Sequence, residues 1–309
     1  MIFTVTLNPA VDRELTVRQI EYDEVLRATE ARVDFGGKGF NVSRILVGMG
    51  VETVAVGFLG GRAGELLQDG LSFLGIGTDF VWVPGETRTN VSIVTQANDH
   101  YIKVNEKGPL IDPGKQIELL DKIDSLVQTG DWWVLSGSLP PGVTADFYAK
   151  IVRVLNVHHA MALLDTGEEA LRLGLRENPF LVKPNASEAH VLTGMPVEAN
   201  EEVKAVATAI REMGAQNVVI SMGKQGAMLQ TSDGTWLTHS PKIKEKNPIG
   251  AGDSMVGGLV YALSKGYSVK EALGWGVASG AATASLPGTQ VGTLPLIESL
   301  LPEVVFTEI

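Results

Sequence analysis

The chain alternates short apolar runs with amphipathic segments over most of its length. The apolar runs occupy residues 54–58, 132–136, 161–165, 180–183 and 218–221. Apolar positions spaced three and four apart predict helices at residues 63–74, 146–157, 168–175, 187–192 and 201–213. Continuous apolar strands separated by helices are typical of a parallel sheet covered on both faces. The pattern therefore predicts a doubly wound α/β fold with a mostly parallel sheet. Two further helices, rich in Ala and Gly, are expected at residues 253–265 and 269–286.

Two stretches break this rhythm. Residues 11–35 and 88–107 alternate apolar and polar positions with period two and contain no helical pattern. In the first stretch, one strand face contains Leu15, Val17, Val33 and Phe35, and the other contains Asp12, Glu14, Arg32 and Asp34. Half-polar strands of this kind favour a small sheet that projects from the main domain. We interpret it as a β lid inserted in two pieces into a core formed by residues 1–10, 36–87 and 108–309.

Composition and charge exclude several classes of protein. Of the 309 residues, 44% are hydrophobic and 20% are charged, which is ordinary for a soluble globular protein. The net charge of −11 disfavours nucleic acid or an anionic membrane as a partner. The chain has no cysteine, which excludes disulfides and thiolate metal sites and suits a reducing cytoplasm, where we expect the protein. The N-terminus has no basic leader, so we expect no signal peptide.

Two glycine-rich segments, residues 36–41 and 247–253, each precede an expected helix. Backbone amides at the start of a helix bind phosphate well where no Cβ atom blocks the approach. The second segment ends in Asp253. A carboxylate beside a phosphate repels it, so some other task must account for Asp253 at this position. The economical task is that of general base for an attacking hydroxyl. The pair of segments thus suggests phosphoryl transfer to an alcohol, although residues 250–253 alone could be a glycine cap with a dipole-stabilising Asp.

Other segments have both a functional and a structural interpretation. Asn185 and Glu188, after a buried strand, share a helix face whose oxygens suit Mg²⁺ held through water, but the same spacing is also a common capping pattern. Residues 221–226 could wrap a nucleotide or form a hairpin turn. Arg88 could bind a phosphate as a planar fork, or be a solvated charge on an edge strand. No P-loop motif and no Gly-x-Gly-x-x-Gly dinucleotide motif occurs in the chain.

Taken together, residues 36–41, 183–188, 221–226 and 247–253 resemble the motifs of the ribokinase/phosphofructokinase-B family of sugar kinases, and the resemblance covers the whole chain. Residues 6–12, with 85–90 and 136–142, resemble the branch that acts on phosphorylated ketohexoses, which includes tagatose-6-phosphate kinases. The resemblance implies a ribokinase-like fold, a β lid, ATP and Mg²⁺ as cofactors, and a homodimer. A lid with one apolar face left in water would be a poor monomer surface, so we expect the two lids to pack together.

The resemblance also implies a role for individual residues. Asp253 would take the proton from the sugar hydroxyl, and the amides of Gly250, Ala251 and Gly252 would hold the transferring phosphate. The residues expected to bind the sugar phosphate are Asp12, Arg27, Gly37, Lys38, Asn41, Arg88, Asn90, Lys103 and Ser136. The residues expected to bind ATP are Lys183, Asn185, Ser221, Gly223, Gly226, Asn247, Gly252, Ala278 and Ala282. Asn185 and Glu188 would orient Mg²⁺ through water.

The implied reaction is ATP-dependent phosphorylation of fructose 1-phosphate to fructose 1,6-bisphosphate. Tagatose 6-phosphate, fructose 6-phosphate or a nucleoside remain alternative acceptors. A non-catalytic sensor of sugar phosphates or nucleotides is the alternative class, and Asp253, which a pure binder would least need, argues against it.

Overall fold

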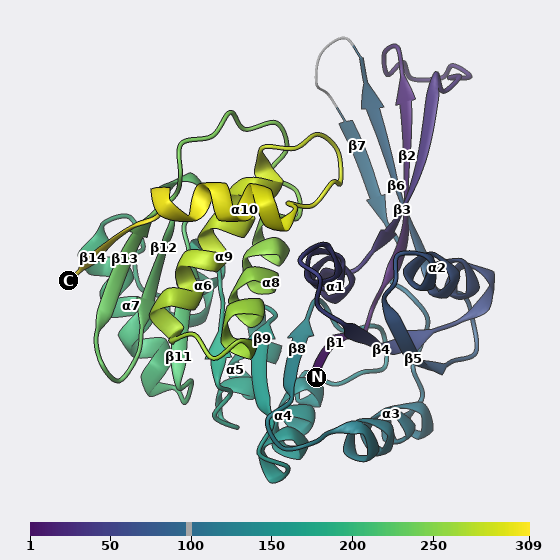
Figure 1. Ribbon diagram of the computed structural model, residues 1–309. Helices are drawn as coiled ribbons and strands as arrows, with labels where there is room; N and C mark the ends of the chain where they lie inside the picture. The colour runs from purple at the N-terminus through teal and green to yellow at the C-terminus, as the bar shows by residue number, and fades with distance from the viewer. Residues whose placement is uncertain (97–100) are drawn as a thin grey trace.

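The computed structural model describes residues 1–96 and 101–309 (Figure 1). Its main feature is a ten-stranded sheet with the strand order β14-β13-β12-β11-β10-β9-β8-β1-β4-β5. The strands are β1 (Ile2–Thr6), β4 (Thr53–Leu59), β5 (Gly77–Trp82), β8 (Trp132–Ser136), β9 (Met161–Asp165), β10 (Leu181–Val182), β11 (Asn217–Ser221), β12 (Ala227–Gln230), β13 (Thr235–His239) and β14 (Val305–Glu308). The strands from β11 to β5 are parallel, and β12, β13 and β14 extend one edge antiparallel. This confirms the mostly parallel sheet that the apolar runs predict.

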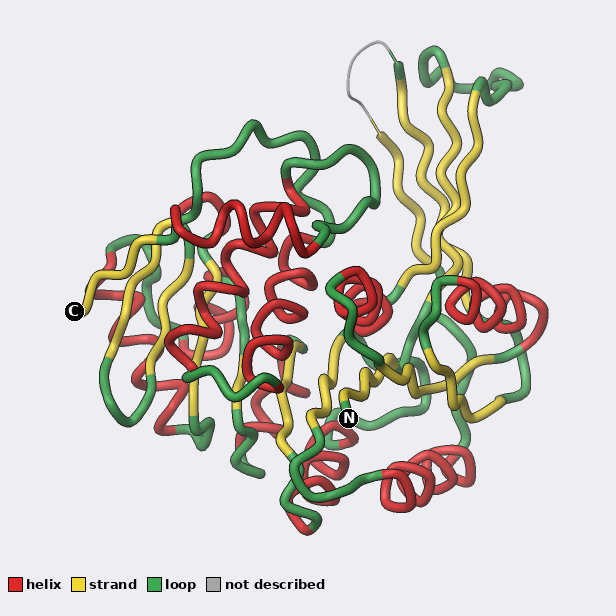
Figure 2. Tube along the Cα trace, viewed as in Figure 1, coloured by secondary structure: helices red, strands yellow, loops and turns green. Residues whose placement is uncertain are grey.

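Helices cover both faces of this large sheet (Figure 2). They are α1 (Lys38–Gly48), α2 (Gly61–Phe73), α3 (Pro113–Leu126), α4 (Phe147–Val157), α5 (Glu168–Leu175), α6 (Ala186–Thr193), α7 (Asn200–Glu212), α8 (Ala251–Ser264), α9 (Val269–Ala284) and α10 (Leu294–Leu300). One core cluster packs α1, α8 and α9 against the sheet, and the other packs α3, α4, α5 and α7 against the opposite face. The doubly wound arrangement predicted from the sequence is therefore confirmed. No helix in the described residues is both long and apolar enough to cross a membrane.

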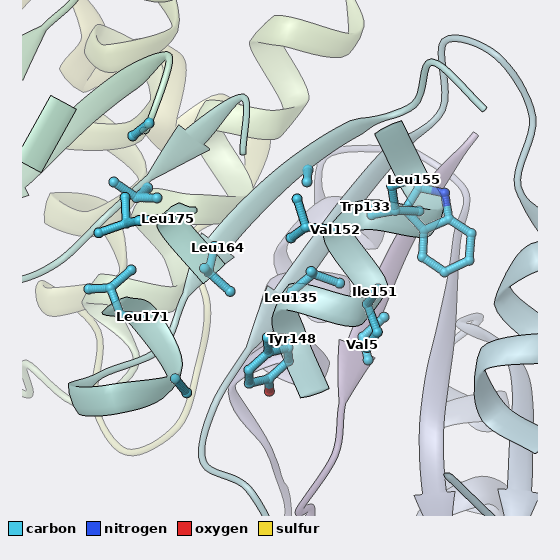
Figure 3. Close-up of a cluster of buried hydrophobic side chains, with 14 of the residues drawn as sticks. Val5, Trp133, Leu135, Tyr148, Ile151, Val152, Leu155, Leu164, Leu171 and Leu175 are labelled. Atoms are coloured by element: carbon cyan, nitrogen blue, oxygen red, sulfur yellow. The ribbon is translucent and has the colours of Figure 1, made fainter. Parts of the chain in front are cut away.

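Strand β8 illustrates why the apolar runs are continuous. Trp133 and Leu135 belong to one core cluster, whereas Val134 belongs to the other, and all three are fully buried. A strand buried on both faces needs apolar side chains at every position, not at alternate ones. Figure 3 shows Leu135 beside Tyr148 of α4. The hydroxyl of Tyr148 donates to the carbonyl of Ser136 at 2.9 Å and so fixes the end of the strand.

A second sheet of four strands projects from the large one (Figure 1). Its strands, in spatial order, are β3 (Glu30–Gly36), β2 (Ala10–Val17), β6 (Arg88–Thr95) and β7 (Tyr101–Asn105). We call it the small sheet. Asp12 lies opposite Asp34 and beside Asn90 in the register, and Glu14 lies opposite Arg32. This register confirms the polar face that the period-two pattern predicts.

The apolar face of the small sheet differs in part from the expectation. Val17 is already buried, and Phe35 packs against α2, where a Cβ atom on Gly70 would collide with its ring. The part of this face that solvent reaches contains Val33, which is 46% exposed, and Val104, which is 60% exposed. Sequence alternation identifies the face of a strand but does not tell which end of it the core covers.

Candidate active site

The parallel strands of the large sheet end side by side at one edge. Thr6 pairs with Ser136, and Ser136 pairs with Asp165, so the last residues of β1, β8 and β9 form a row. Lys183 follows the end of β10, and Ser221 ends β11 opposite Asn185. Ligands bind to open α/β sheets at this carboxyl edge. The topology therefore gathers Ser136, Lys183, Asn185 and Ser221, which lie far apart in the sequence, along one edge.

Asp253 lies in the first turn of α8 and is 9% exposed. The helix begins at Gly250, whose φ of 79° lies in the left-handed region that favours glycine, and no side chain caps its first turn. Asn41, near the start of α1, donates from Nδ2 to Oδ2 of Asp253 at 2.7 Å. Thus the two glycine-rich segments meet, and a carboxylate stands beside an uncapped helix N-terminus.

The electrostatics of Asp253 suit a base. Burial and, secondarily, the nearby carboxylate of Asp165 raise the pKa of Asp253 to about 6, while Asn41, Lys38 and Lys183 oppose the rise. A carboxylate with this pKa is ionised at neutral pH and accepts a proton more readily than an exposed one.

Asp165 is a site residue that the sequence prediction did not include. Its carboxylate is 1% exposed and lies between two lysines, with Oδ1 3.3 Å from Nζ of Lys183 and 3.6 Å from Nζ of Lys38. A Cβ atom on Gly252 would lie 3.9 Å from the Lys183 ammonium, so this cation is close to the N-terminus of α8. Two lysines beside an uncapped helix start are suited to binding an anion. The sequence feature that could have identified Asp165 is a carboxylate at the end of an otherwise apolar strand.

The pKa of Lys38 also reflects this cluster. Burial is the largest single influence and lowers it, but the carboxylates of Asp165, Asp253 and Glu188 together raise it above its usual value. Lys38 therefore remains a cation at every physiological pH. Its neighbour Gly37 has a φ of 152°, and a side chain there would meet Thr6, so glycine lets α1 begin close to the end of β1.

Polar groups of the small sheet face the same region. Asn90 donates from Nδ2 to Oδ1 of Asp12 at 2.8 Å, and Asp12 lies against Gly36, where a Cβ atom would collide with its carboxylate. Within the described residues, the buried atoms Asn90 Oδ1 and Ser136 Oγ have no hydrogen-bond partner. Because unpaired buried polar atoms are costly, hydroxyl groups of a bound ligand are suitable partners for them.

Arg88 is engaged with the backbone. Its guanidinium donates to the carbonyls of Asn8 at 2.8 Å, Glu106 at 3.2 Å and Pro9 at 3.4 Å. Burial lowers the pKa of Arg88, and Asp12 counteracts this. Arg88 therefore ties together chain segments that cross between the two sheets, and the interpretation as a solvated edge charge is wrong.

Two of the expected sugar-phosphate ligands are exposed on the small sheet or on the loop at its end. Arg27 is exposed in the loop between β2 and β3, at the outer end of the small sheet (Figure 1). Lys103 is exposed on β7, opposite Ser92 and two positions beyond Asn105, the partner of Asn90. Within one chain the structure brings Asn41 and Lys38 to Asp253. It brings Asp12 to Asn90 and to Gly36, at the start of the first glycine-rich segment.

A cavity of about 800 Å³ adjoins the N-terminus of α8, a volume in the usual range for small-molecule sites. Its lining includes Asn185, Ser221, Gly223, Gly226 and Gly252, all of which the sequence analysis proposes for ATP. It also includes Lys224, which belongs to the segment 221–226, and residues that the sequence analysis did not identify, namely Ser240, Pro241, Lys242, Ile243 and Glu245. These mostly belong to an irregular loop after β13, which has no motif that could have singled it out.

The residues of α9 that line this cavity differ from the two that the resemblance implies, Ala278 and Ala282. Ala278 and Ala282 are fully buried in the core between α9 and the sheet. The residues of α9 that line the cavity are Val277, Gly280, Ala281 and Ala284. They follow the spacing of three and four residues that places side chains on one helix face. In a helix rich in Ala and Gly, polar and apolar positions do not alternate, so the sequence does not show which face lines the cavity.

Asn185 and Glu188 form a capping box at the start of α6. The backbone amide of Glu188 donates to Oδ1 of Asn185 at 2.9 Å, and the amide of Asn185 donates to Oε2 of Glu188 at 2.8 Å. The structural interpretation of this pair is therefore confirmed. Residues 1–96 and 101–309 contain no group of three or more His, Cys, Asp or Glu side chains that could hold a metal ion by themselves.

Asn247 supports the backbone near the cavity and does not line it. Its Nδ2 donates to the carbonyl of Gly288 at 2.8 Å, and its Oδ1 accepts from the amide of Ile249 at 3.0 Å. These bonds fix the turn that leads through Pro248 into Gly250 and the start of α8.

The chain is similar to known carbohydrate kinases in sequence and in fold. Residues 5–296 match the pfkB family of carbohydrate kinases. The chain is 37% identical over 309 residues to a 1-phosphofructokinase of Bacillus subtilis, covering 100% of both chains. Among solved structures, phosphofructokinase-2 of Escherichia coli in complex with substrates and products matches with a TM-score of 0.91 and 29% identity over 98% of each chain. Ribokinase of Arabidopsis thaliana, complexed with ribose and ATP, matches in fold with a TM-score of 0.79 and 19% identity, covering 97% of this chain and 98% of that one.

The chain therefore belongs to the pfkB family of carbohydrate kinases. Its fold is ribokinase-like, and membership of a kinase family implies ATP as the phosphoryl donor.

Proposed function

We propose that this carbohydrate kinase transfers the γ-phosphate of ATP to the free primary hydroxyl of fructose 1-phosphate, forming fructose 1,6-bisphosphate. The observation that supports this most is the buried Asp253, with a pKa of about 6, beside the uncapped N-terminus of α8. A base and an anion site in one helical turn are what in-line transfer to an alcohol requires.

Each part of the site has a place in this reaction. ATP occupies the 800 Å³ cavity with its terminal phosphate at the amides of Gly250, Ala251 and Gly252. Asp253 accepts the proton of the sugar hydroxyl as that oxygen attacks the phosphorus. Lys38 and Lys183 stabilise the charge that develops on the transferring group. A Cβ atom on Gly252 would lie 3.9 Å from Nζ of Lys183, and Asp165 holds both ammonium groups within 3.6 Å of its carboxylate.

The acceptor lies between the small sheet and the large one. Asp12 and Asn90 bind its ring hydroxyls, and Arg88 with Lys38 holds the phosphate that it already has. Arg88 donates to three backbone carbonyls and retains two further N–H groups for an anion. The small sheet acts as a lid over a core formed by the rest of the chain. Of the expected lid ranges 11–35 and 88–107, residues 97–100 lie outside the described residues.

Mg²⁺ fits this site as a cofactor held mainly by ATP and water. The Oε2 atom of Glu188 serves the capping box, which leaves Oε1 for a metal-bound water. Asn185 and Glu188 would orient the ion, whose chemistry when bound is to neutralise the phosphate charges. A site without a protein cage is usual for Mg²⁺.

Fructose 1-phosphate is favoured over its isomers because the Bacillus relative, which matches over the full length, is named a 1-phosphofructokinase. The test is an ADP-release assay with fructose 1-phosphate, fructose 6-phosphate and tagatose 6-phosphate at equal concentrations, with Asp253→Asn as the inactive control. The proposal requires the highest kcat/KM for fructose 1-phosphate. A higher value for either 6-phosphate would reassign the acceptor, and no ADP release with any of them would contradict a ketohexose phosphate as the acceptor.

A further inference from the structure

The small sheet and the large domain are joined at a second place, away from Arg88. Thr289, in the loop of residues 285–293 between α9 and α10, donates from Oγ1 to Oδ1 of Asp34 at 2.8 Å. The other oxygen of Asp34 accepts from Nε of Arg32 at 2.8 Å. Arg32 and Asp34 are both on β3 and on the same face of the small sheet as Asp12. The contact is therefore between the sheet that bears the acceptor ligands and a loop of the core.

Two arginines hold the same loop. A Cβ atom on Gly288 would lie 2.6 Å from Nη1 of Arg32, so that guanidinium lies directly over Gly288. Arg44 of α1 donates from Nη2 to the carbonyl of Thr289 at 3.0 Å. Arg32 also forms an ion pair with Glu14 of β2 at 3.4 Å. Residues 288 and 289 are thus fixed by side chains from β3 and α1.

Hydrogen bonds also join this part of the chain to residues 246 and 247, next to the nucleotide cavity. Nδ2 of Asn247 donates to the carbonyl of Gly288 at 2.8 Å, and the amide of Lys246 donates to the carbonyl of Ala284 at 2.8 Å. Ala284 and Pro248 both line the cavity. Consequently Gly288 is contacted by Arg32 of the small sheet and also by Asn247, which lies three positions before the start of the anion site at Gly250.

We propose that Asp34, Arg32 and Thr289 form a latch that couples closure of the small sheet over the acceptor to the geometry of the nucleotide site. The inference rests on the proposed function, which places the sugar phosphate at the small sheet and ATP in the cavity. An acceptor that draws the small sheet toward the core stabilises the latched loop, and the latched loop fixes the turn before α8. By linkage, each ligand then tightens the binding of the other by the same factor.

Thr289→Val tests the latch, because it removes the hydroxyl and keeps a branched side chain of similar size. Calorimetric titration gives the Kd of a non-hydrolysable ATP analogue with and without a saturating sugar phosphate, chosen as the isomer with the highest turnover. Thr289→Ser, which restores the hydroxyl, is the conservative control. Thr129→Val is the remote control, because Thr129 also donates to a backbone carbonyl, that of His158, at 3.0 Å.

In the wild type we expect the sugar phosphate to tighten binding of the analogue by about 5- to 20-fold, a usual size for coupling between sites. Thr289→Val should reduce this factor to about 2-fold or less, since a hydrogen bond to a carboxylate is worth at least that difference. Its Kd for the analogue alone should rise less than its Kd in the presence of the sugar phosphate, because the acceptor is what stabilises the latched loop. Thr289→Ser and Thr129→Val should keep the wild-type coupling.

Coupling that persists in Thr289→Val, or a wild type without coupling, would overturn the latch. An equal loss of nucleotide affinity with and without sugar phosphate would also overturn it, because that is a structural effect only. The proposed function fails separately, by absence of turnover with every sugar phosphate. Hydrogen exchange in the ligand-free protein then decides the contact itself: the latch requires faster exchange in residues 285–293 of Thr289→Val than of Thr289→Ser, and equal exchange would refute it.

Discussion

Asn41 and Asp253, 212 positions apart in the chain, are joined by a hydrogen bond of 2.7 Å between Nδ2 and Oδ2. Each belongs to one of the two glycine-rich segments, so this bond holds the start of α1 against the start of α8. It also orients the carboxylate, because Asn41 occupies one oxygen and leaves the other for a substrate hydroxyl. The position of the base thus depends on a residue from the opposite half of the protein.

Asp253→Asn keeps the shape of the side chain and removes the base. We expect turnover to fall by roughly 10²- to 10⁴-fold, the usual contribution of general-base catalysis, while ATP still binds. The measurement is kcat by ADP release, with nucleotide affinity by calorimetry. Retention of more than about a tenth of the activity at pH 7 would disprove the assignment.

Stability provides the control for this variant. A pKa of about 6, above the ordinary 3.8, means that the ionised Asp253 is unfavourable in the folded protein. The cost is on the order of 3 kcal/mol above pH 6 and disappears as pH falls below about 4. Asp253→Asn should therefore melt at a higher temperature than the wild type at pH 7.5 and at a similar temperature at pH 4. A lower melting temperature of Asp253→Asn at pH 7.5 would mean that loss of stability, and not loss of the base, explains the lost activity.

The pH dependence of kcat/KM should identify the neighbours that set this pKa. The wild-type rate should rise with pH through about 6, as Asp253 loses its proton. Asn41→Ala removes a bond that lowers the pKa, so its acid limb should move to higher pH. Asp165→Asn removes a negative charge that raises the pKa, so its acid limb should move to lower pH. Shifts in the same direction, or none, would contradict the electrostatic account.

The fold could be predicted because the signals for it are local. The apolar run at 161–165 and the amphipathic segment at 168–175 coincide with β9 and α5. Strands β12, β13 and β14 at the edge are short and antiparallel. For residues 221–226, just before β12, the sequence analysis gave two interpretations, a nucleotide loop or a turn. The structure places Gly223 and Gly226 both in a turn between β11 and β12 and on the cavity wall, so the two interpretations are compatible.

The site could be predicted only in part. Glycine motifs and the capping pattern at Asn185 identify backbone positions, because they depend on short-range geometry. Asp165 was missed because its lysine partners lie 127 and 18 residues away in the chain, and a single buried carboxylate has no motif. The carbonyl partners of Arg88 were also unpredictable, since any residue supplies a carbonyl. Long-range partners and the orientation of featureless helices such as α9 require the tertiary structure.

Glu188→Gln tests the metal role without disturbing the helix start, because a capping box accepts either Glu or Gln. We expect the Mg²⁺ concentration for half-maximal activity to rise by about 10-fold or more, with little change in the KM of the sugar phosphate. The measurement is a Mg²⁺ titration at saturating sugar and ATP. Unchanged half-saturation and turnover would leave Glu188 with its capping role alone.

Arg88→Ala should raise the KM of the sugar phosphate by roughly 10- to 150-fold, since a hydrogen bond to a charged group is worth about 1.5–3 kcal/mol. The KM of ATP should change much less. Arg88→Lys, which keeps the charge but not the planar fork, should give an intermediate value. Because Arg88 also binds three backbone carbonyls, thermal unfolding should be measured in parallel. Equal effects on both KM values would mean that Arg88 serves only to stabilise the junction of the two sheets.

The exposed apolar face of the small sheet predicts a dimer. Val33, Ile102 and Val104 are 46%, 37% and 60% exposed, and the register places them on the face opposite Asp12. An apolar sheet face is costly in water and is covered economically by the same face of a second copy. Sedimentation should therefore give about twice the chain mass of 32.9 kDa.

Val33→Asp combined with Val104→Asp should yield monomers, because it places four charges in the paired interface. These positions are better choices than Val17 and Phe35, which contact the protein's own interior and would unfold it if charged. Val157→Asp is the matched control: it places the same charge at a valine that is 73% exposed at the end of α4, away from the small sheet, and it should leave the dimer intact. The monomers should bind the sugar phosphate weakly, since an unsupported small sheet holds Asp12 and Asn90 less firmly. A wild-type monomer with full activity at micromolar concentration would refute the dimer.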